Sequence, residues 1–224
     1  MYAVLGNVFL HLHPARLPKH AVKIGYTWCM GGLSFFLFVV LTITGILLMF
    51  YYRPTVEYAY TDMIDLTEQV PLGIMRELHR WGAHAMVLTV WLHMLRVFMT
   101  GSYKPPREFN WGVGVLLMTM TLFLSFTGYL LPWDQLAMWA VTVGTNMARA
   151  TPFLGHEGPF QEYVFGVSPR YDARSLLIGG SLVGPPALLR FYVLHCIFIP
   201  LVAGALMIVH FWRIRKDGGI SGPL

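Results

Sequence analysis

Four histidines lie in apolar segments as two pairs, and their spacing is the strongest chemical signal in the sequence. His79 and His93 are fourteen residues apart, and His195 and His210 are fifteen residues apart. On an α-helix, fourteen residues advance about 21 Å and complete almost four turns. Both imidazoles of a pair therefore lie on nearly one face, one near each edge of a hydrocarbon layer about 30 Å thick. Two such helices can clamp two flat metal cofactors stacked across a membrane.

The arrangement of these ligands favours haem over zinc. Neutral imidazole binds haem iron, zinc and copper, but zinc needs three or four ligands that converge on one point. Antiparallel helices would pair His79 with His195 at the outer side. They would pair His93 with His210 at the cytoplasmic side. Two axial imidazoles at each level predict two six-coordinate b-type haems, which have no open position and carry electrons.

Four glycines repeat the fourteen-residue spacing on the two helices that carry no histidine pair. Gly31 and Gly45 lie on the first predicted helix, and Gly114 and Gly128 lie on the third. Glycine lets a bulky planar ring approach the backbone. Small residues also serve ordinary helix packing in membranes, but together with the histidines these four glycines favour haem packing.

Arginines near the histidines are candidate partners of the anionic haem propionates. Simple anchoring at the membrane interface is the alternative for each of them. The candidates at the outer level are Arg76, Arg80 and Arg190, and those at the inner level are Arg96, Arg213 and Arg215.

The composition indicates a membrane protein. Of 224 residues, 56% are hydrophobic and only 12% are charged, against about 25% charged in soluble domains. Three runs (24–52, 109–133 and 191–212) contain no Asp, Glu, Lys or Arg and are long enough to span a bilayer. Arg76, Arg80 and Arg96 can snorkel from the ends of a fourth, shorter run. We predict transmembrane helices at about 30–52, 74–100, 112–131 and 189–213.

The charge distribution orients these four helices. The side that holds both termini and the 101–111 loop carries nine basic and two acidic residues, and the other side carries seven basic and nine acidic residues. The positive-inside rule then places the termini in the cytoplasm, or in the stroma of a plastid. The basic pI of about 9.3 is thus a topology signal, and we expect no nucleic-acid partner.

The connections are expected on the outer side. A polar loop is predicted at 53–73, and a long connection at 133–187 begins with an amphipathic segment, 135–148, too short to span. We predict an all-α membrane protein with one domain, 1–224. Its fold is a four-transmembrane-helix bundle that encloses two b-type haems, with a surface helix in the loop between helices 3 and 4.

Several motifs, in order along nearly the whole chain, resemble the N-terminal, four-helix cytochrome b family of the bc and b6f complexes, and its b6 branch most closely. The fourteen-then-fifteen histidine spacing also resembles that branch. The motifs are Trp28-Cys29-Met30-Gly31-Gly32, Phe50-Tyr51-Tyr52-Arg53-Pro54-Thr55-Val56, His79-Arg80-Trp81, Lys104-Pro105-Pro106-Arg107-Glu108, Gly128-Tyr129-Leu130-Leu131-Pro132-Trp133-Asp134-Gln135, Arg190-Phe191-Tyr192 and Ile220-Ser221-Gly222-Pro223-Leu224.

The resemblance implies a function that the spacing alone does not give. Cys29, which by itself reads as a small buried hydrophobic residue, matches the cysteine that holds a third, covalent haem c by a thioether. The family runs a Q-cycle coupled to proton translocation, as a subunit of a quinol–cytochrome c or plastocyanin oxidoreductase. Its quinol is oxidised at the outer side, near positions that match Tyr129, Pro132, Trp133, Met138 and Trp139.

The resemblance also implies partners and a location. The expected partners are a subunit-IV-like membrane protein, a Rieske iron–sulfur protein, a c-type cytochrome, quinol and quinone, and the lipid bilayer, in a dimeric complex. The expected location is the bacterial cell membrane or the thylakoid membrane.

Two departures from the family pattern affect these expectations. Residues 171–175 read as an insertion on the side where an iron–sulfur head domain would dock. One extra residue follows Lys216, which affects how Arg215 and Lys216 would contact the inner haem. Two other classes remain open: a dihaem membrane anchor of a dehydrogenase or hydrogenase, and a haem-free transporter or structural subunit.

Overall fold

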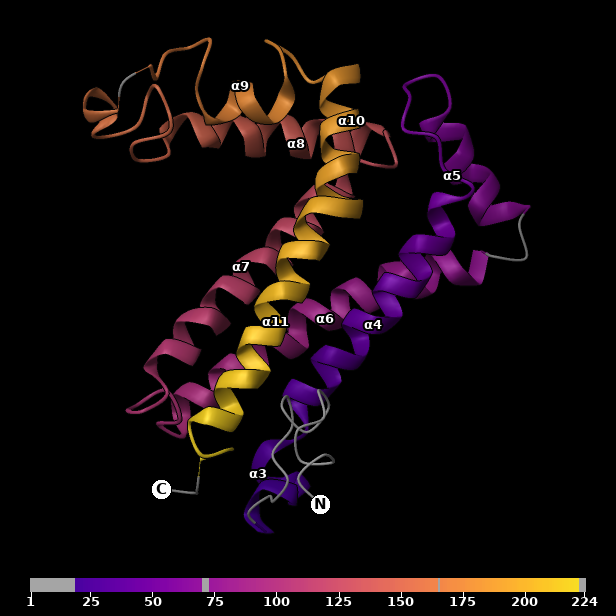
Figure 1. The fold of residues 1–224 in the computed structure, drawn as a ribbon. Coiled ribbons are helices and arrows are strands. Elements are labelled where there is room, and N and C mark those ends of the chain that lie inside the picture. Colours follow the sequence, from indigo (N-terminus) through magenta and orange to yellow (C-terminus); the bar gives the residue numbers. More distant parts are fainter. Residues whose placement is uncertain (1–18, 70–72, 165, 222–224) are drawn as a thin grey trace, which may run out of the picture. The chain divides into compact units, whose positions relative to one another are not determined.

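The four long apolar segments form helices in the structure, a computed structural model that describes residues 19–69, 73–164 and 166–221. They are α4 (Met30–Met49), α6 (Gly73–Met99), α7 (Glu108–Tyr129) and a run from Pro185 to Lys216, and each is long and apolar enough to cross a membrane. The last run joins α10 (Pro185–Val193), the π-helix η4 (Leu194–Phe198) and α11 (Ile199–Lys216) (Figure 1). Over the described residues the chain forms helices and turns without a strand, which confirms the predicted all-α membrane fold.

Shorter helices occupy the connections. They are η1 (Lys19–Val22), α3 (Ile24–Thr27), α5 (Ala59–Glu68), α8 (Gln135–Met147), η2 (Ala148–Ala150), η3 (Gln161–Tyr163) and α9 (Ala173–Ile178). The helix predicted at 135–148 corresponds to α8, which begins where the Asp134 side chain accepts a hydrogen bond from the Ala137 N–H at 2.7 Å. The prediction of a loop at 53–73 was wrong for its middle, because α5 buries Ala59 and Leu66 on one face.

The chain divides into two compact units that interleave along the sequence. Unit 1 comprises the described residues of Met1–Ile43, His79–Leu122 and Pro200–Leu224, and unit 2 comprises those of Thr44–Leu78 and Phe123–Ile199. Each of the four long helical runs contributes one segment to each unit. The one-domain organisation stays a prediction, and the units are described separately below.

Unit 1 packs segments of α4, α6, α7 and α11 through small and polar contacts. The Ser34 hydroxyl on α4 donates to the Thr89 hydroxyl on α6 at 3.1 Å. The Leu41 side chain of α4 packs against Gly82 of α6, where an added Cβ would stand 3.2 Å from Cδ2 of Leu41. Phe35 of α4 meets Phe211 of α11 edge to face, with ring centroids 5.2 Å apart. Small residues thus permit close helix approach here, as they do between helices in lipid.

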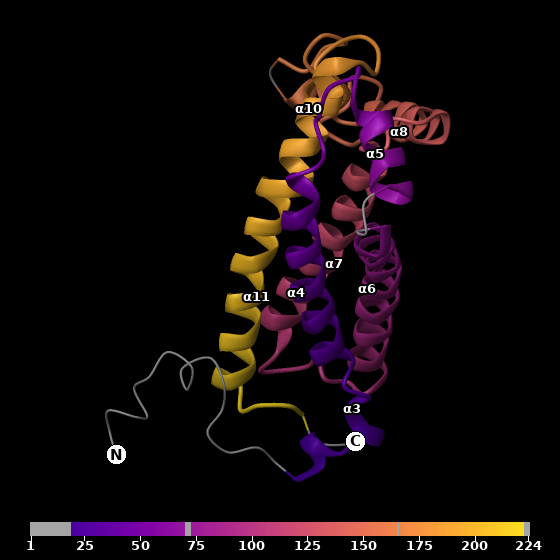
Figure 2. The same ribbon diagram turned by 90° about the vertical axis from the view of Figure 1, so that its right-hand side faces the viewer.

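Unit 2 holds the best-packed apolar core of the described chain. Leu130, Val141, Ile178, Ala187 and Phe191 are fully buried together and join α8, α9 and α10 to the end of α7. Figures 1 and 2 show α8 crossing the direction of α10, and Figure 1 shows α9 alongside α8. This core fixes the connection that precedes the last long helical run.

Side-chain and main-chain hydrogen bonds hold the segment after α4 in unit 2. The Tyr52 hydroxyl donates to the Leu131 carbonyl at 2.6 Å, and burial raises the pKa of Tyr52 well above its usual range. The Asp62 carboxylate accepts hydrogen bonds from the Arg53 side chain and main chain. These hydrogen bonds, led by the guanidinium, lower the pKa of Asp62 although its burial opposes the shift.

Residues 171–175, which the sequence analysis predicted to be an insertion, include the N-cap and the first residues of α9. The Asp172 carboxylate caps this helix by accepting from the Ser175 N–H at 2.8 Å, and it also pairs with His156 at 2.5 Å. Burial alone would raise the pKa of Asp172, but the hydrogen bonds from Ser175 and His156 lower it. The insertion is therefore an ordered part of unit 2.

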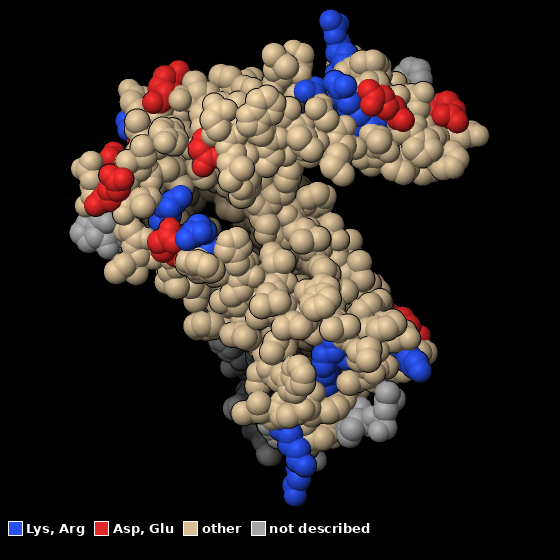
Figure 3. Space-filling view, turned by 180° about the vertical axis from the view of Figure 1, so that it is seen from behind, with Lys and Arg blue, Asp and Glu red and all other residues tan. Residues whose placement is uncertain are grey.

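The long helices direct apolar side chains outward and several polar ones inward. Phe36 and Leu201 are 61% and 69% exposed, whereas Thr89 and Thr127 are buried. Figure 3 shows long stretches of helix surface without a charged side chain. This pattern suits helices whose outer solvent is lipid.

Candidate functional site

The inner histidine pair, His93 on α6 and His210 on α11, comes together in unit 1. The two imidazole centroids are 6.5 Å apart, and the ring planes lie at 79°. A metal held between two imidazoles by bonds of about 2 Å, the usual metal–imidazole length, would separate the ring centroids by about 6 Å. The spacing of the pair thus fits two axial ligands of one metal.

Two of the predicted glycines lie against these rings. A Cβ at Gly31 would stand 3.1 Å from Cε1 of His93, and a Cβ at Gly114 would stand 3.9 Å from Cε1 of His210. The backbone therefore passes close to both imidazoles, and a side chain larger than hydrogen would crowd the His93 ring.

A pocket opens beside the inner histidine pair, and we call it the inner pocket. Its lining residues are His93, Met94, Arg96, Val97, Ser102, Arg107, Asn110, Trp111, Gly114, His210, Ile214, Gly219, Ile220 and Ser221. Three buried polar atoms on lining residues have no hydrogen-bond partner among the described residues, namely Nη2 of Arg96, Oδ1 of Asn110 and Nδ1 of His210. An unpaired cationic donor beside two imidazoles fits the carboxylate edge of a haem.

Sequence reasoning missed Asn110, whose main-chain carbonyl lies near the His210 ring without a hydrogen bond to its Nδ1. A ligating histidine usually directs its second ring nitrogen to a carbonyl or carboxylate. A main-chain interaction of this kind leaves no residue-type signal, so the sequence could not identify it. Arg107, which the sequence analysis named only within the Lys104-Pro105-Pro106-Arg107-Glu108 motif, also lines the pocket.

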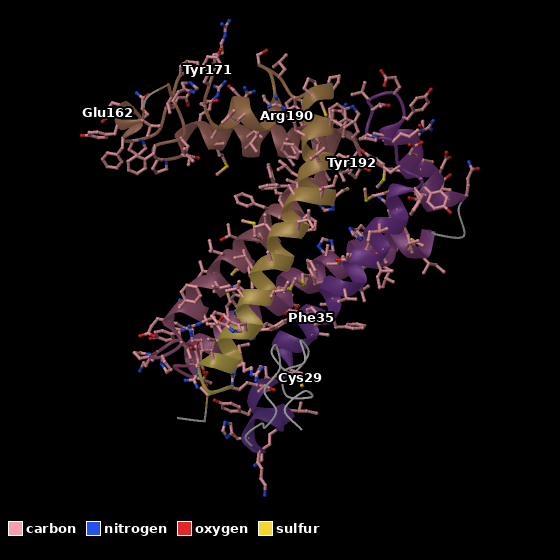
Figure 4. The ribbon with its side chains drawn as sticks, in the orientation of Figure 1. Cys29, Phe35, Glu162, Tyr171, Arg190 and Tyr192 are labelled. Carbon is pink, nitrogen blue, oxygen red and sulfur yellow. The ribbon has the colours of Figure 1, made fainter. Side chains whose placement is uncertain are left out.

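Cys29 lies at the junction of α3 and α4 (Figure 4) and caps the start of α4, because its carbonyl accepts from the Leu33 N–H at 2.8 Å. Its φ of 52° follows that of Trp28 at 50°, so two left-handed residues break the helix here. The thiol is free and exposed, unlike the buried residue that the alternative interpretation expected. It is two residues from Gly31, which packs against His93.

In unit 2, His195 lies within the π-helix η4 and against Gly128 of α7. A Cβ at Gly128 would stand 2.6 Å from Cε1 of His195, closer than real contacts allow. Nδ1 of His195 is 3.0 Å from the Leu124 carbonyl and 3.4 Å from the Thr127 hydroxyl. If Nδ1 donates to the carbonyl, Nε2 is the ring nitrogen that could bind a metal.

The π-helix explains the fifteen-residue spacing between His195 and His210. A π-turn has i to i+5 hydrogen bonds and takes up one residue more than an α-turn. Residues Leu194–Phe198 form such a turn. The π-turn can therefore take up the one residue by which this spacing exceeds that between His79 and His93.

His79 belongs to a different unit from His195, and Gly45 belongs to a different unit from Gly31. His79, on α6, belongs to unit 1, where it interacts with the main-chain carbonyl of Leu41. Gly45 lies in the part of α4 that belongs to unit 2. The outer assignment of His79 with His195 stays a prediction.

The predicted propionate arginines have varied surroundings. Arg96 donates from Nε to the Tyr26 carbonyl at 3.2 Å and lies 4.3 Å over the Tyr26 ring. Arg76 pairs with Glu77 at 3.2 Å, and Arg80 stacks on Trp81. Arg190 donates a hydrogen bond to the Leu176 carbonyl, and Arg213 forms an ion pair with Asp217 at 2.8 Å. The Arg215 side chain is half-buried.

The predicted quinol-site residues share unit 2 but differ in exposure. Trp133, at a φ of 53°, and Met138 pack against the apolar core. Tyr129 and Trp139 are exposed, and Pro132 lies in the turn that leads from α7 to α8. The exposed pair thus presents aromatic rings on either side of this turn.

Comparisons with known proteins point to one family. The chain matches the family model described as Cytochrome b/b6/petB over residues 17–218. It is 40% identical over 221 residues to cytochrome b6 of Heliomicrobium gestii, covering 98% of this chain and 95% of that protein. It is 42% identical over 209 residues to the menaquinol:cytochrome c reductase cytochrome b subunit of Bacillus subtilis (strain 168), covering 92% and 86%.

A solved structure supports the same relationship. The chain superposes on a chain of a hyperthermophilic respiratory complex III with a TM-score of 0.77 and 27% identity. The match covers 89% of this chain and 50% of that chain, so the present chain spans half the length of its structural relative.

Proposed function

Because this chain belongs to the cytochrome b/b6 family, we propose that it is the transmembrane electron-transfer subunit of a quinol oxidoreductase. In this proposal, quinol is oxidised on the outer side and electrons cross the membrane to a quinone on the cytoplasmic side. Haem b is the cofactor that this family implies, and when bound it supplies one-electron carriers. The observation that carries the proposal is the inner histidine pair, with ring centroids 6.5 Å apart.

We assign the axial ligands by level. His93 and His210 would hold the inner haem, and His79 and His195 would hold the outer haem. Support comes from main-chain carbonyls that interact with two of the four rings, contributed by Leu41 and Leu124. Such carbonyls fix the orientation of a ligating ring and raise its basicity.

The glycines and arginines complete each site. Gly31, Gly114 and Gly128 keep side chains away from the ligand rings, and Gly45 is assigned the same role on α4. Arg96 is the favoured propionate partner at the inner level because its Nη2 is buried and available. The assignment to a propionate is weaker for the other candidates, Arg76, Arg80, Arg190 and Arg215. The first three of these already have side-chain or main-chain contacts.

Cys29 is proposed to hold a covalent haem c. Its thiol is exposed and sits two residues before Gly31, at the end of α4 that belongs to the unit of the inner histidine pair. An exposed thiol can form a thioether without unfolding its surroundings. The left-handed break at Trp28 and Cys29 separates the thiol from the regular helix.

The outer quinol site is assigned to Tyr129, Pro132, Trp133, Met138 and Trp139. The complex is proposed to contain a subunit-IV-like protein, a Rieske protein and a c-type cytochrome as a dimer. The name of the Bacillus subtilis relative, a menaquinol:cytochrome c reductase subunit, supports a quinol donor and a cytochrome c acceptor. The termini are placed in the cytoplasm, or in the stroma if the membrane is a thylakoid.

Histidine variants test the proposal directly. Membranes that carry His93→Leu or His210→Leu should lose one of two b-type absorption signals, because a six-coordinate haem needs both ligands. His84→Leu is the matched control, since His84 lies on the same helix as His93 and packs on Trp81 with ring centroids 5.7 Å apart. Equal haem content in all three variants and the wild type would refute the assignment.

A further inference from the structure

A set of side-chain hydroxyls runs between the half-exposed His20 and the inner pocket of unit 1. The Tyr26 hydroxyl donates to the Ser221 carbonyl at 2.8 Å and lies 3.3 Å from the Ser221 hydroxyl. Nε2 of His20 is 3.1 Å from the same carbonyl, and its ring meets the Tyr26 ring edge to face. His20 and Tyr26 thus converge on one residue of the segment after α11.

The hydroxyl contacts continue to the pocket. The Ser221 hydroxyl forms a short hydrogen bond with the Ser102 hydroxyl, which lies 2.7 Å from the Thr100 hydroxyl. Ser102 and Ser221 both line the inner pocket, together with the inner histidine pair. A hydroxyl donates one hydrogen and accepts others, so successive hydroxyls in contact can pass a proton along.

The segment that carries Ser221 is held in place by charged side chains. Arg107 donates to the Gly219 carbonyl from two nitrogens at 3.4 Å. Arg213 pairs with Asp217 at 2.8 Å. Gly218 and Gly219 adopt φ values of 85° and 84°, which glycine allows without strain and which turn the chain back towards α3. The hydroxyl contacts are therefore part of a fixed arrangement.

We propose that Tyr26, Ser221 and Ser102 form a proton relay that serves quinone reduction at the inner pocket. The proposal rests on the proposed function, because it requires a quinone to be reduced on this side. Reduction of one quinone to quinol consumes two electrons and two protons and forms two O–H bonds. The electrons come from quinol oxidised on the outer side, and the protons come from water at the partly exposed Tyr26 through the relay.

A network of this kind could also serve only to hold the chain end in place, and Ser221→Ala separates the two roles. This substitution removes the hydroxyl but keeps the carbonyl that accepts from Tyr26 and His20. The segment should stay docked while the relay is interrupted. Ser102→Ala interrupts the same relay from the other side.

The experiment uses the purified whole complex with a short-chain naphthoquinol as donor and a c-type cytochrome as acceptor. Stopped-flow spectra at the b-type absorption band follow two phases, reduction by quinol and reoxidation by quinone. In Ser221→Ala and Ser102→Ala we expect reduction at the wild-type rate and reoxidation slowed about tenfold. Loss of a positioned proton donor costs about 100-fold or more, and water can replace a hydroxyl in part.

Matched variants separate relay from structure. Ser221→Thr and Ser102→Thr keep a hydroxyl and should restore reoxidation. Thr119→Val is the control, because the Thr119 hydroxyl contacts only its own helix carbonyl, that of Val115, at 2.9 Å. The slow phase of the alanine variants should also slow further in D₂O, which a purely structural defect would not cause.

Each outcome has a defined meaning. Reoxidation at the wild-type rate in both alanine variants, with haem content unchanged, would overturn the relay. Slow reoxidation that the threonine variants fail to restore would overturn it as well and assign the hydroxyls a structural role. If quinol fails to reduce the wild-type complex, the proposed function itself is wrong.

Discussion

Gly128 of α7 offers a sharp test of how tightly a histidine is positioned. In Gly128→Ala the new Cβ would stand 2.6 Å from Cε1, 3.0 Å from Nδ1 and 3.1 Å from Nε2 of His195. Ordinary van der Waals contact begins near 3.4 Å. The imidazole must therefore retreat by about 0.8 Å, because helix backbone and a packed side chain resist larger rearrangement.

This displacement is large compared with what a metal site tolerates. Metal–ligand distances in proteins are held to within about 0.2 Å. The retreat would also strain the 3.0 Å contact between Nδ1 of His195 and the Leu124 carbonyl. Overpacking of this kind typically costs about 1–3 kcal/mol. Since 1.4 kcal/mol is tenfold in an equilibrium constant, affinity for the outer haem should fall by about 5- to 150-fold.

The assay is the number of haems per purified chain by pyridine haemochrome, together with a redox titration of the b-type band. Gly128→Ala should lose the outer component, either as reduced haem content or as a shifted midpoint potential. Gly112→Ala is the matched control, because Gly112 lies on the same helix and its added Cβ would meet nothing within 4 Å. Two unshifted components in Gly128→Ala would refute the positioning argument.

Three further predictions follow from the described contacts. Cys29→Ala should abolish haem staining on a denaturing gel and leave the extractable haems in place, whereas persistent staining would exclude a thioether at this residue. The lowered pKa of Asp62 stabilises the protein above about pH 4, the usual aspartate pKa, and this contribution is lost as pH falls through the lower folded pKa. Asp62→Asn should therefore reduce thermal stability more at pH 7 than at pH 3, and an equal loss at both would contradict the role of Arg53. Tyr52→Phe should lower unfolding free energy by about 1–2 kcal/mol, because the Leu131 carbonyl loses its 2.6 Å donor; unchanged denaturation of the detergent-solubilised protein would count against it.

The fold could be predicted because its signals are local and strong. Long uncharged runs identify membrane-length helices directly, and α4, α6, α7 and the Pro185–Lys216 run lie close to the predicted ranges. The predicted ends of the helices were less accurate where residues next to the apolar run determine the first turn. The last run starts earlier than predicted because Pro185 and Pro186 are favourable in a first helical turn.

The types and spacing of side chains in the sequence predicted residues of the candidate site. They did not predict the backbone geometry around these residues. Histidine and glycine spacing pointed to residues that the structure places against one another, as Gly31 with His93 and Gly128 with His195. The π-turn around His195 had a trace in the sequence, the additional residue before His210, which did not by itself reveal where it is absorbed.

Other features left no sequence signal because they depend on the main chain or on distant packing. The Asn110 carbonyl beside His210 is one example. Arg190 is another, since its contact with the Leu176 carbonyl depends on how α9 packs. The hydroxyl network around Ser221 joins residues more than a hundred positions apart, among them Ser102.

The most direct test of the central claim is haem quantification on the purified chain before and after acid–acetone extraction, with haem staining on a denaturing gel. The assignments made here predict two extractable b-type haems per chain, and one retained haem that Cys29→Ala removes. A purified, folded chain that contains no haem would contradict the histidine assignments on which this account of the protein depends.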